Sequence, residues 1–534
     1  MTRPLAAWVR ATVLPLIVAL VTLHALAGPG YLVQVDIAFG PTMPPLHWTF
    51  FTPVSLLLHL SQWAIGGGAT GSLYVISALA APGFGAMVLL RDKRGYTQSA
   101  CGLLAMLNPF VYDRLVEGQW GVLFATGGLF LFVAGWLVMQ RTPGIRTAAA
   151  TTAAALFAVM FSPNFIGIVA AAAIALSLAA TQWNQPEARR WTIAALVSSG
   201  ALSAYGVIPF FTNHGAMTYE SYQNVTTFSA ADFAAFQSTP DPHFGVIAAL
   251  AGLYGEWSER IGRYTVANVA YPWAVASTLV LFGLAVAGAW LRPSRAWLLP
   301  LGAVGIAVSA ITSTRWGLQT VVSLAHHFPL LAAYREPQKW DVLWLLALVV
   351  LGAEAIERGG EFLARRFRAI PAGPALAALM TIAAIAPAGF VQLRDTTAVV
   401  KPVTYPGSWY RAADYLRAHV PAGSPVVVLP WHLYESLPFV GHPSENPADV
   451  FFPGTLVISL DPEVPGTVPI DAIGQAAARR QGCALADAVR DVGSHWAVAF
   501  PDAADGEAQQ AALQRCGFSA VLTPTADVAV LRDR

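Results

Sequence analysis

Long apolar runs constrain this chain more than any other feature of its sequence. A run of about 17–25 apolar residues is long enough to cross the hydrocarbon core of a bilayer as a helix. Hydrophobic residues make up 56% of the 534 positions and charged residues only 11%, whereas soluble domains carry roughly 25% charged residues. The sequence therefore predicts an α-helical polytopic membrane protein and excludes an ordinary soluble enzyme.

We predict about eleven transmembrane helices, at approximately residues 10–28, 71–91, 97–112, 119–140, 146–161, 163–181, 190–211, 270–291, 296–312, 340–358 and 370–391. A further apolar segment at 50–66 follows a Pro-rich stretch, and we expect it to be re-entrant or to lie in the membrane interface.

Basic residues predict how these helices are oriented, because short cytoplasmic loops are enriched in Lys and Arg. Clusters of Lys and Arg follow the second, fourth, sixth, eighth and tenth predicted helices, so all of them fall on the side of the N-terminus. Arg260 and Arg263 fall on the other side, in a long loop where the rule is weaker. We therefore predict a multi-pass plasma-membrane protein with a cytoplasmic N-terminus and larger outer loops at 29–70 and 212–269. The net charge of +1 gives no reason to expect a nucleic-acid partner.

The composition changes after Phe390 to a polar, Pro-rich segment. We divide the chain into a transmembrane domain, residues 1–391, and an extracytoplasmic α/β domain, residues 392–534. Helical spacing at Trp409–Val420 is followed by turn residues and a buried-strand pattern at Ser424–Pro430. The remaining expected elements are strands at His495–Phe500, Ser519–Leu522 and Val528–Leu531 and a helix at Glu507–Cys516. No Gly-rich loop follows any of these strands, so we expect no nucleotide site.

Only three cysteines occur, and none belongs to a Cys-x-x-Cys pair or a His/Cys cluster that would suggest a metal site. Cys101 lies in an apolar run. Cys483 and Cys516 lie in the polar C-terminal region, where they form a disulfide if that region is extracytoplasmic or remain buried free thiols.

A charged motif directly precedes the apolar run that begins at Val342. It contains Arg335, Glu336 and Lys339, and Pro337 is a residue typical of the first helical turn. Backbone N–H groups at a helix N-terminus favour an anion, and the two cations add positive charge. We interpret the motif as a phosphate-binding corner to which His326 or His327 contributes. The alternative is an internal ion pair that caps the helix, and the two interpretations are compatible.

Candidate acids and bases lie on the predicted outer face. Asp36 is the only carboxylate in the first outer loop, and a partly desolvated carboxylate there can act as a general base; otherwise it is a solvated loop residue. Asp113 and Arg114 follow another predicted helix and form either part of the same site or an ion pair at the membrane interface. The predicted outer loop at 212–269 combines aromatic and acidic residues, a combination that is typical of carbohydrate binding. An aromatic belt at the membrane interface would give the same sequence pattern. The residues concerned are Tyr219, Glu220 and Trp257.

Three segments together resemble the GT-C glycosyltransferases, membrane enzymes that use polyprenyl-phosphate-linked sugars, and in particular arabinofuranosyltransferase-like proteins of actinobacteria. These segments are Gly30–Asp36, Leu107–Tyr112 and Tyr334–Lys339. The resemblance implies that Asp36 is the catalytic base, with Asp113 as the substitute, and that Arg335, Lys339 and Arg114 stabilise a lipid-phosphate leaving group. It implies a polyprenyl-phosphate sugar as donor and a cell-envelope glycan or lipid as acceptor. Some members use a divalent metal, whereas the lone carboxylate of this first loop favours a metal-independent reaction.

Two other functions compete with this interpretation. A transporter or flippase for a lipid-linked glycan would place charged residues at mid-membrane or show inverted repeats, whereas the charges here gather at the predicted outer surface. A catalytically inactive GT-C-like scaffold is the other alternative, because the first outer loop offers a single carboxylate.

Overall fold

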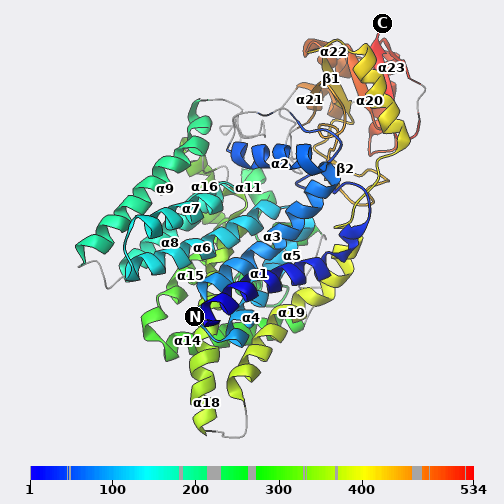
Figure 1. Cartoon of the computed structure of the whole chain (residues 1–534). Helices are drawn as coiled ribbons and strands as arrows, with labels where there is room; N and C mark the ends of the chain where they lie inside the picture. Colours follow the sequence, from blue (N-terminus) through cyan, green and yellow to red (C-terminus); the bar gives the residue numbers. More distant parts are fainter. Residues whose placement is uncertain are drawn as a thin grey trace.

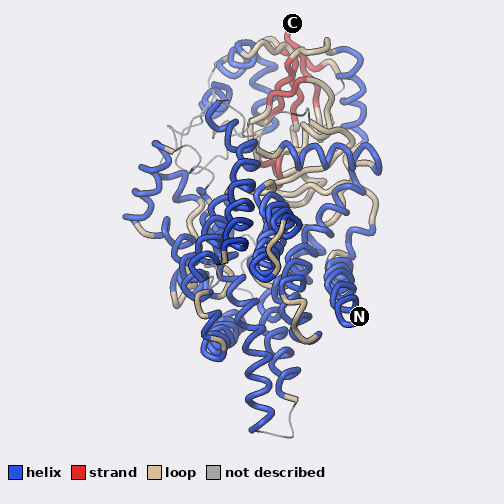
Figure 2. Tube along the Cα trace, turned by 60° about the vertical axis from the view of Figure 1, so that its left-hand side comes forward, coloured by secondary structure: helices blue, strands red, loops and turns tan. Residues whose placement is uncertain are grey.

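The protein was analysed as a computed structural model, which describes residues 2–44, 46, 50–179, 185–212, 230–261, 272–328, 331, 334–366, 371–459, 472–479, 482–522 and 525–534. A bundle of helices forms most of the molecule, and an α/β domain that contains the C-terminus sits at one end of it (Figure 1). Figure 2 shows the strands gathered at that same end. The bundle consists of α1 (Thr2–Thr22), α2 (Thr52–Ile65), α3 (Gly67–Leu89), α4 (Gly95–Met106), α5 (Pro109–Glu117), α6 (Trp120–Arg141), α7 (Ile145–Val159), α8 (Asn164–Ala179), α9 (Pro186–Thr212), α11 (Ala230–Ala235), α12 (Gly245–Ala251), α14 (Trp273–Leu291), α15 (Leu298–Ala310), α16 (Arg315–His327), α17 (Val342–Glu354), α18 (Gly360–Arg366) and α19 (Ala372–Ala398).

Six segments of the described chain are long and apolar enough to cross a membrane. They are Leu5–Thr22, Gly67–Leu89, Trp120–Arg141, Pro186–Ile208, Trp273–Leu291 and Pro293–Ser313. The other five predicted transmembrane helices fall on α4 with α5, α7, α8, α17 and α19. That these also cross the membrane stays a prediction.

The predicted helix at 97–112 is wrong as a single element, because it breaks at Asn108. Pro109 disfavours helical geometry in the residue before it, and Asn108 is extended, with φ −126° and ψ 163°. The Asn108 side chain then caps the next helix by accepting a hydrogen bond from the Val111 N–H at 3.2 Å. The result is two helices, α4 and α5, with α5 leading directly to the loop that precedes α6.

Helix α17 forms the centre of the bundle, and all 13 of its residues are buried. A helix that is apolar on every side is stable only when other helices surround it, and α14, α15 and α4 pack against it. Its N-terminal end continues from a 3₁₀ turn, η7 (Pro337–Asp341). The charged motif before Val342 is therefore anchored to a fully buried helix.

Helix α2 runs across the bundle beneath the α/β domain in Figure 1. One side exposes large apolar residues, among them Leu57, Leu60 and Trp63, of which Trp63 is 88% exposed. Such an outward apolar face is typical of a helix that lies in the membrane interface. The helix occupies the predicted segment 50–66, and its interfacial position stays a prediction.

The α/β domain contains a mixed five-stranded sheet of order β4-β1-β5-β7-β6. Strand β1 (Pro425–Leu429) pairs in parallel with β4 (Thr455–Val457) and β5 (Trp496–Ala499), whereas β7 (Ala529–Asp533) pairs antiparallel with β5 and β6 (Phe518–Ala520). Helices α20 (Gly407–His419), α21 (Ala472–Arg479), α22 (Ala484–Asp491) and α23 (Gly506–Arg515) accompany the sheet. The expected strands and helices are confirmed. Sequence reasoning did not find β4, α21, α22 or a separate two-stranded ribbon, β2 (Tyr434–Glu435) and β3 (Ser444–Glu445).

Cys483 and Cys516 form a disulfide, so the alternative of two free thiols is excluded. The bond joins the residue before α22 to the residue after α23 and closes a sequence separation of 33 residues. Cys101 is a buried free thiol.

The first outer loop is built into the α/β domain rather than lying free above the bundle. Tyr31 forms an antiparallel bridge with Val403, and Val33 belongs to the same apolar cluster as Tyr405 and Trp409. The Tyr405 hydroxyl donates to the Phe39 carbonyl at 3.0 Å. The loop that carries Asp36 is thus held between the bundle and the α/β domain.

Ion pairs join the basic clusters at the other end of the bundle. Lys93 lies 2.8 Å from Glu354, Arg94 lies 2.9 Å from Glu361, and α18 with its basic residues extends away from the α/β domain (Figure 1). This arrangement agrees with the expectation that the basic loops share one side. Which side faces the cytoplasm stays a prediction, as does the domain boundary at residue 392.

Candidate functional site

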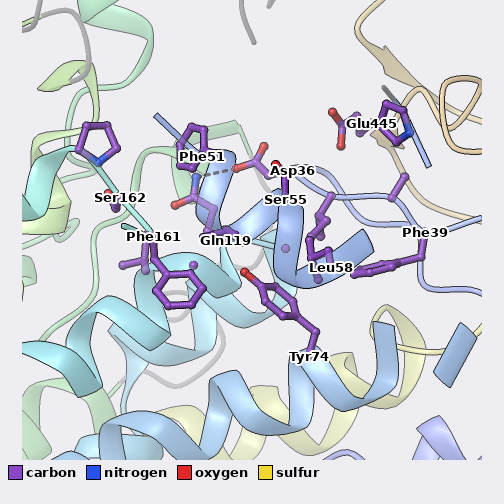
Figure 3. A pocket seen from close by; sticks show the side chains of 18 of the residues that line it. Asp36, Phe39, Phe51, Ser55, Leu58, Tyr74, Gln119, Phe161, Ser162 and Glu445 are labelled. Carbon is purple, nitrogen blue, oxygen red and sulfur yellow. Dashed lines mark hydrogen bonds between the residues drawn. The ribbon is translucent and has the colours of Figure 1, made fainter. Parts of the chain in front are cut away.

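A cavity of about 440 Å³ lies where the bundle meets the α/β domain. The first outer loop, α2, the start of α6, the segment before α17 and the α/β domain all contribute to its wall. Part of the wall is apolar: Figure 3 shows Phe51, Leu58, Tyr74 and Phe161 around the same space as Asp36 and Gln119. The cavity can therefore accept a ligand that is charged at one part and apolar at another.

Backbone contacts fix the position of Asp36. Its N–H donates to the Glu117 carbonyl at 2.9 Å, and a turn closes around it where the Gln34 N–H donates to the Ile37 carbonyl at 2.8 Å. Gly118, which ends α5, has φ +86°, a conformation that glycine adopts at low cost. A Cβ on Gly118 would lie 2.8 Å from the Gln34 Cβ, so only glycine lets the loop come this close.

Gln119 connects the two sequence motifs on either side of it. Its amide nitrogen donates to Asp36 Oδ2 at 2.7 Å and to Glu336 Oε2 at 2.9 Å. Its oxygen accepts from the Arg114 guanidinium at 2.5 Å. Sequence reasoning did not select Gln119; its place directly before the apolar run of α6 was the available signal.

The charged motif before α17 is both internally paired and open to the cavity. Lys339 Nζ lies 3.0 Å from Glu336 Oε2, and both residues line the cavity together with Arg335. The Arg335 guanidinium also lies 4.5 Å from the centroid of the Phe236 ring, a cation–π contact. The expected helix N-terminus is confirmed, because Pro337 opens the turn that leads into α17. The internal ion pair is therefore present, whereas phosphate binding by the motif stays a prediction.

Asp36 and Glu336, the two carboxyls that Gln119 contacts, have opposite shifts of their pKa values. Burial and the nearby Glu336 raise the pKa of Asp36 to about 6, although the Gln119 hydrogen bond and the charges of Lys339 and Arg335 oppose the rise. Burial also acts to raise the pKa of Glu336, but Lys339, Arg114 and Arg335 outweigh it and lower that pKa to about 2. Near neutral pH Glu336 is a fixed negative charge, whereas Asp36 can take up and release a proton.

Arg114 lies behind the cavity wall and does not line the cavity. It contacts Glu256 at 3.2 Å, Glu336 at 3.5 Å and Glu117 at 3.8 Å, and it is fully buried. A buried Arg surrounded by carboxylates compensates their charge. Arg114 is therefore connected to the cavity only indirectly, through Gln119 and Glu336.

The structure does not bring Asp113 to the cavity. Its side chain is buried, and Asp113 is not among the residues that line the cavity. His326 and His327 are exposed at the end of α16 and do not line the cavity either. Tyr219 and Glu220 lie outside the described residues.

Trp257 lines the cavity and packs edge-on against Phe236, with ring centroids 4.9 Å apart. Within the described part of the chain its buried indole N–H has no hydrogen-bond partner.

Three polar cavity residues that come from the α/β domain were missed. Tyr434, Glu445 and Asp449 line the cavity, and the Tyr434 hydroxyl lies 3.4 Å from Asp36 Oδ1 as a hydrogen-bond donor. Asp36 is therefore the only carboxylate of its loop but one of four in the cavity wall, with Glu336, Glu445 and Asp449. No sequence signal links residues about 400 positions apart. Among the described residues no group of three or more His, Cys, Asp or Glu side chains is arranged to hold a metal ion, and metal independence stays a prediction.

The fold resembles that of known membrane glycosyltransferases. No protein-family profile matches the sequence, and no curated protein matches it. The solved structure of arabinofuranosyltransferase AftD from Mycobacteria superposes on 97% of this chain and 39% of its own, with a TM-score of 0.63 and 15% identity. The R1389S mutant of AftD in its class 2 structure covers 97% of this chain and 41% of its own, with a TM-score of 0.59 and 15% identity. The chain spans about two fifths of AftD.

Similarity to a second enzyme is weaker. The oligosaccharyltransferase AglB from Archaeoglobus fulgidus superposes with a TM-score of 0.39 at 14% identity and covers 99% of this chain and 70% of its own. Because this TM-score is low, no conclusion is drawn from the similarity to AglB. The expected resemblance to GT-C membrane glycosyltransferases is confirmed at the level of the fold. At such low identity this shows the architecture alone.

Proposed function

We propose that the protein is a membrane glycosyltransferase that moves a sugar from a polyprenyl-phosphate donor to a cell-envelope glycan or lipid acceptor. One observation carries the proposal: the Asp36 carboxylate shares a cavity with Arg335 and Lys339, although some 300 residues separate them in sequence. A base and a phosphate-binding pair in one cavity are the two parts that glycosyl transfer from a phosphate requires.

The lining supports a donor that is both lipid and anion. Lys339 and Arg335 attract the phosphate, and the N-terminal end of the η7–α17 helix adds a favourable dipole. The apolar part of the wall, which includes Phe51, Leu58 and Phe161, is suited to prenyl carbons. The name of the structural relative AftD favours a pentofuranosyl group as the first sugar to test.

The reaction that follows is a displacement at the anomeric carbon. The ionised Asp36 carboxylate accepts the proton of an acceptor hydroxyl, whose oxygen forms the new bond to the anomeric carbon. The bond between that carbon and the phosphate oxygen breaks, and its electron pair leaves with the polyprenyl phosphate. Lys339 and Arg335 stabilise the departing charge. Asp36 then returns its proton to solvent.

The proposal places the cavity on the extracytoplasmic side of the plasma membrane, with about eleven transmembrane helices and a cytoplasmic N-terminus. The disulfide of the α/β domain supports this orientation, because disulfides persist in oxidising compartments. An alkaline phosphatase fusion to the C-terminus should be active in cells. An inactive fusion on a stably expressed protein would contradict the orientation.

The test of the activity uses the full chain in lipid nanodiscs with synthetic polyprenyl-phosphoryl arabinofuranose and neutral glycan acceptors. We expect a glycosylated product by mass spectrometry, and loss of one envelope glycan linkage in a deletion strain. Binding of undecaprenyl monophosphate should weaken about tenfold in Lys339→Met and remain unchanged in the control Lys401→Met, at an exposed residue that does not line the cavity. Equal binding by wild type and Lys339→Met would reject the phosphate site.

A further inference from the structure

The β2–β3 ribbon places a tyrosine and a glutamate side by side in the cavity wall. In its antiparallel register Tyr434 lies directly opposite Glu445, and Glu435 lies opposite Ser444. Residues that face each other across two antiparallel strands project to the same side. Tyr434 and Glu445 both line the cavity, whereas Glu435 and Ser444 are buried on the other side of the ribbon. Figure 3 shows Glu445 across from Asp36.

The ribbon is fixed to the loop that carries Asp36. The Glu445 N–H donates to the Gln34 carbonyl at 2.8 Å, and the Tyr434 hydroxyl reaches Asp36 Oδ1 at 3.4 Å. Asp36 is thus contacted through one oxygen by Gln119 and through the other by Tyr434. The ribbon therefore reaches Asp36 directly, whereas the charged motif before α17 is linked to Asp36 through Gln119.

The Arg and Lys side chains of the described cavity wall lie on one of its two sides, together with the carboxyls of Asp36 and Glu336. The bundle side carries Arg335 and Lys339, whereas the α/β domain contributes Glu445 and Asp449 to the wall. Among the described wall residues the α/β domain supplies no cation, so the domain side offers nothing that would hold the donor headgroup. A carboxylate offers two acceptor oxygens to neighbouring hydroxyls, and a tyrosine presents an apolar face with a polar tip. Such a pair recognises a neutral polyhydroxylated ring.

The electrostatics of Glu445 fit the same ligand. Burial, with the charges of Asp449 and Asp36, holds the pKa of Glu445 well above its usual range. Burial also raises the pKa of Asp449 to about 6. A protonated carboxyl both donates and accepts hydrogen bonds, as does a sugar hydroxyl.

We propose that Tyr434 and Glu445 form the acceptor subsite, where they hold a neutral glycan with one hydroxyl directed at Asp36. The α/β domain is then part of the reaction site and not only an appendage. This inference rests on the proposed function for its role in transfer, but the binding of a neutral glycan at the ribbon can be measured independently of it.

The experiment compares two ligands on the full chain in nanodiscs. Binding of neutral octyl glycosides of arabinofuranose, mannose and galactose is followed by saturation-transfer NMR, and binding of undecaprenyl monophosphate by intrinsic fluorescence. The variants are Glu445→Gln and Tyr434→Ala, with Tyr434→Phe to separate the hydroxyl from the ring. Asp414→Asn, an exposed carboxylate on α20 of the same domain, is the matched control.

We expect Glu445→Gln and Tyr434→Ala to weaken binding of at least one glycoside about tenfold or more, while undecaprenyl monophosphate binds within twofold of wild type. Asp414→Asn should change neither. Unchanged glycoside binding in both variants, or no glycoside binding by the wild type, overturns the subsite. Parallel loss of both ligands in a variant with an unchanged melting temperature also overturns it, because the ribbon would then not be specific for the acceptor.

Failure of the proposed function gives a different pattern. If the wild type does not bind undecaprenyl monophosphate but binds a glycoside in a Glu445-dependent way, the glycosyl-donor proposal fails and the glycan subsite stands. In a working transfer assay, Glu445→Gln should raise KM for the acceptor about tenfold and leave KM for the donor unchanged. A rise confined to the donor KM would overturn the acceptor role.

Discussion

The side-chain amide of Gln119 donates a hydrogen bond to Oδ2 of Asp36 at 2.7 Å. Because the oxygen of the same amide accepts from Arg114, the amide is held in one orientation. The bond stabilises the ionised form of Asp36 and lowers its pKa against the effect of burial. Gln119 therefore helps to set the pH at which Asp36 can accept a proton.

The pH dependence of transfer follows from the Asp36 pKa of about 6. The carboxylate is the basic form, so it is present above that pH and is lost below it. We expect kcat/KM for the acceptor to fall about tenfold per pH unit below pH 6 and to be level between pH 7 and 8. Initial rates across that range measure the profile. A rate that increases as the pH falls from 7 to 5 would contradict Asp36 as the base.

Replacement of Gln119 by methionine tests its electrostatic role. Gln119→Met keeps the length of the side chain but removes the donor, so the acidic limb of the profile should move upward by about one pH unit. Gln140→Met is the control, because Gln140 lies near the other end of α6, does not line the cavity and donates to Thr192. An unshifted limb in an active Gln119→Met enzyme would show that this hydrogen bond does not tune Asp36.

Asp36→Asn removes the base and retains the shape of the side chain. We expect transfer to fall by about 10²–10⁴-fold, while undecaprenyl monophosphate still binds because Arg335 and Lys339 are unchanged. The comparison with Asp414→Asn, which should retain full activity, controls for the loss of a carboxylate. Undiminished transfer by Asp36→Asn would assign the proton to another group.

Gly118→Ala tests the close approach of the Asp36 loop to α5. The positive φ and the short distance to Gln34 should make alanine cost about 1–3 kcal/mol and lower the melting temperature. Gly283→Ala is the matched control, since no atom lies within 4 Å of a Cβ at that position of α14. It should be neutral or slightly stabilising. Equal melting temperatures for the two variants would contradict the constraint.

Loss of the Cys483–Cys516 disulfide should destabilise the α/β domain. In the loop-closure picture a separation of 33 residues corresponds to about 3–4 kcal/mol. Cys483→Ser and Cys516→Ser are expected to increase protease cleavage in the domain to a similar extent, because either one breaks the same bond. Cys101→Ser, at the buried free thiol outside the domain, should not expose these sites. Unaltered proteolysis in the first two variants would show that the bond is dispensable.

Local patterns predicted the elements of this fold well. The apolar runs marked the helices, and the alternation of turn residues with short apolar runs marked β1, β5, β6 and β7. Pro337 correctly marked the turn before α17. The break at Asn108 was missed because the apolar run continues through it, although Asn-Pro is itself a signal for the start of a helix. Helices, strands and turns depend mainly on residues that are close in the sequence, so they can be predicted from the sequence itself.

The membership of the site depended on long-range packing instead. The sequence predicted Asp36, Arg335 and Lys339 as site residues because each is a charged residue near a predicted transmembrane helix. It also selected Asp113 and the His326–His327 pair, which the fold directs elsewhere. Tyr434 and Glu445 carry no local mark of function, and they reach the cavity only through the ribbon that docks on the first outer loop.

The sequence alone determined that this chain is a helical membrane protein with a polar α/β domain, because hydrophobic periodicity and composition are local properties of the chain. It also indicated which charged residues lie beside apolar helices, where the free-energy cost of a charge suggests a function. That Asp36, Gln119, the motif before α17 and the β2–β3 ribbon share one cavity is visible only in the three-dimensional structure. The cavity is assembled by contacts between segments that lie far apart in the sequence. These contacts are the close approach at the Gly118 turn, the bridge between Tyr31 and Val403, and the packing of other helices around the buried helix α17.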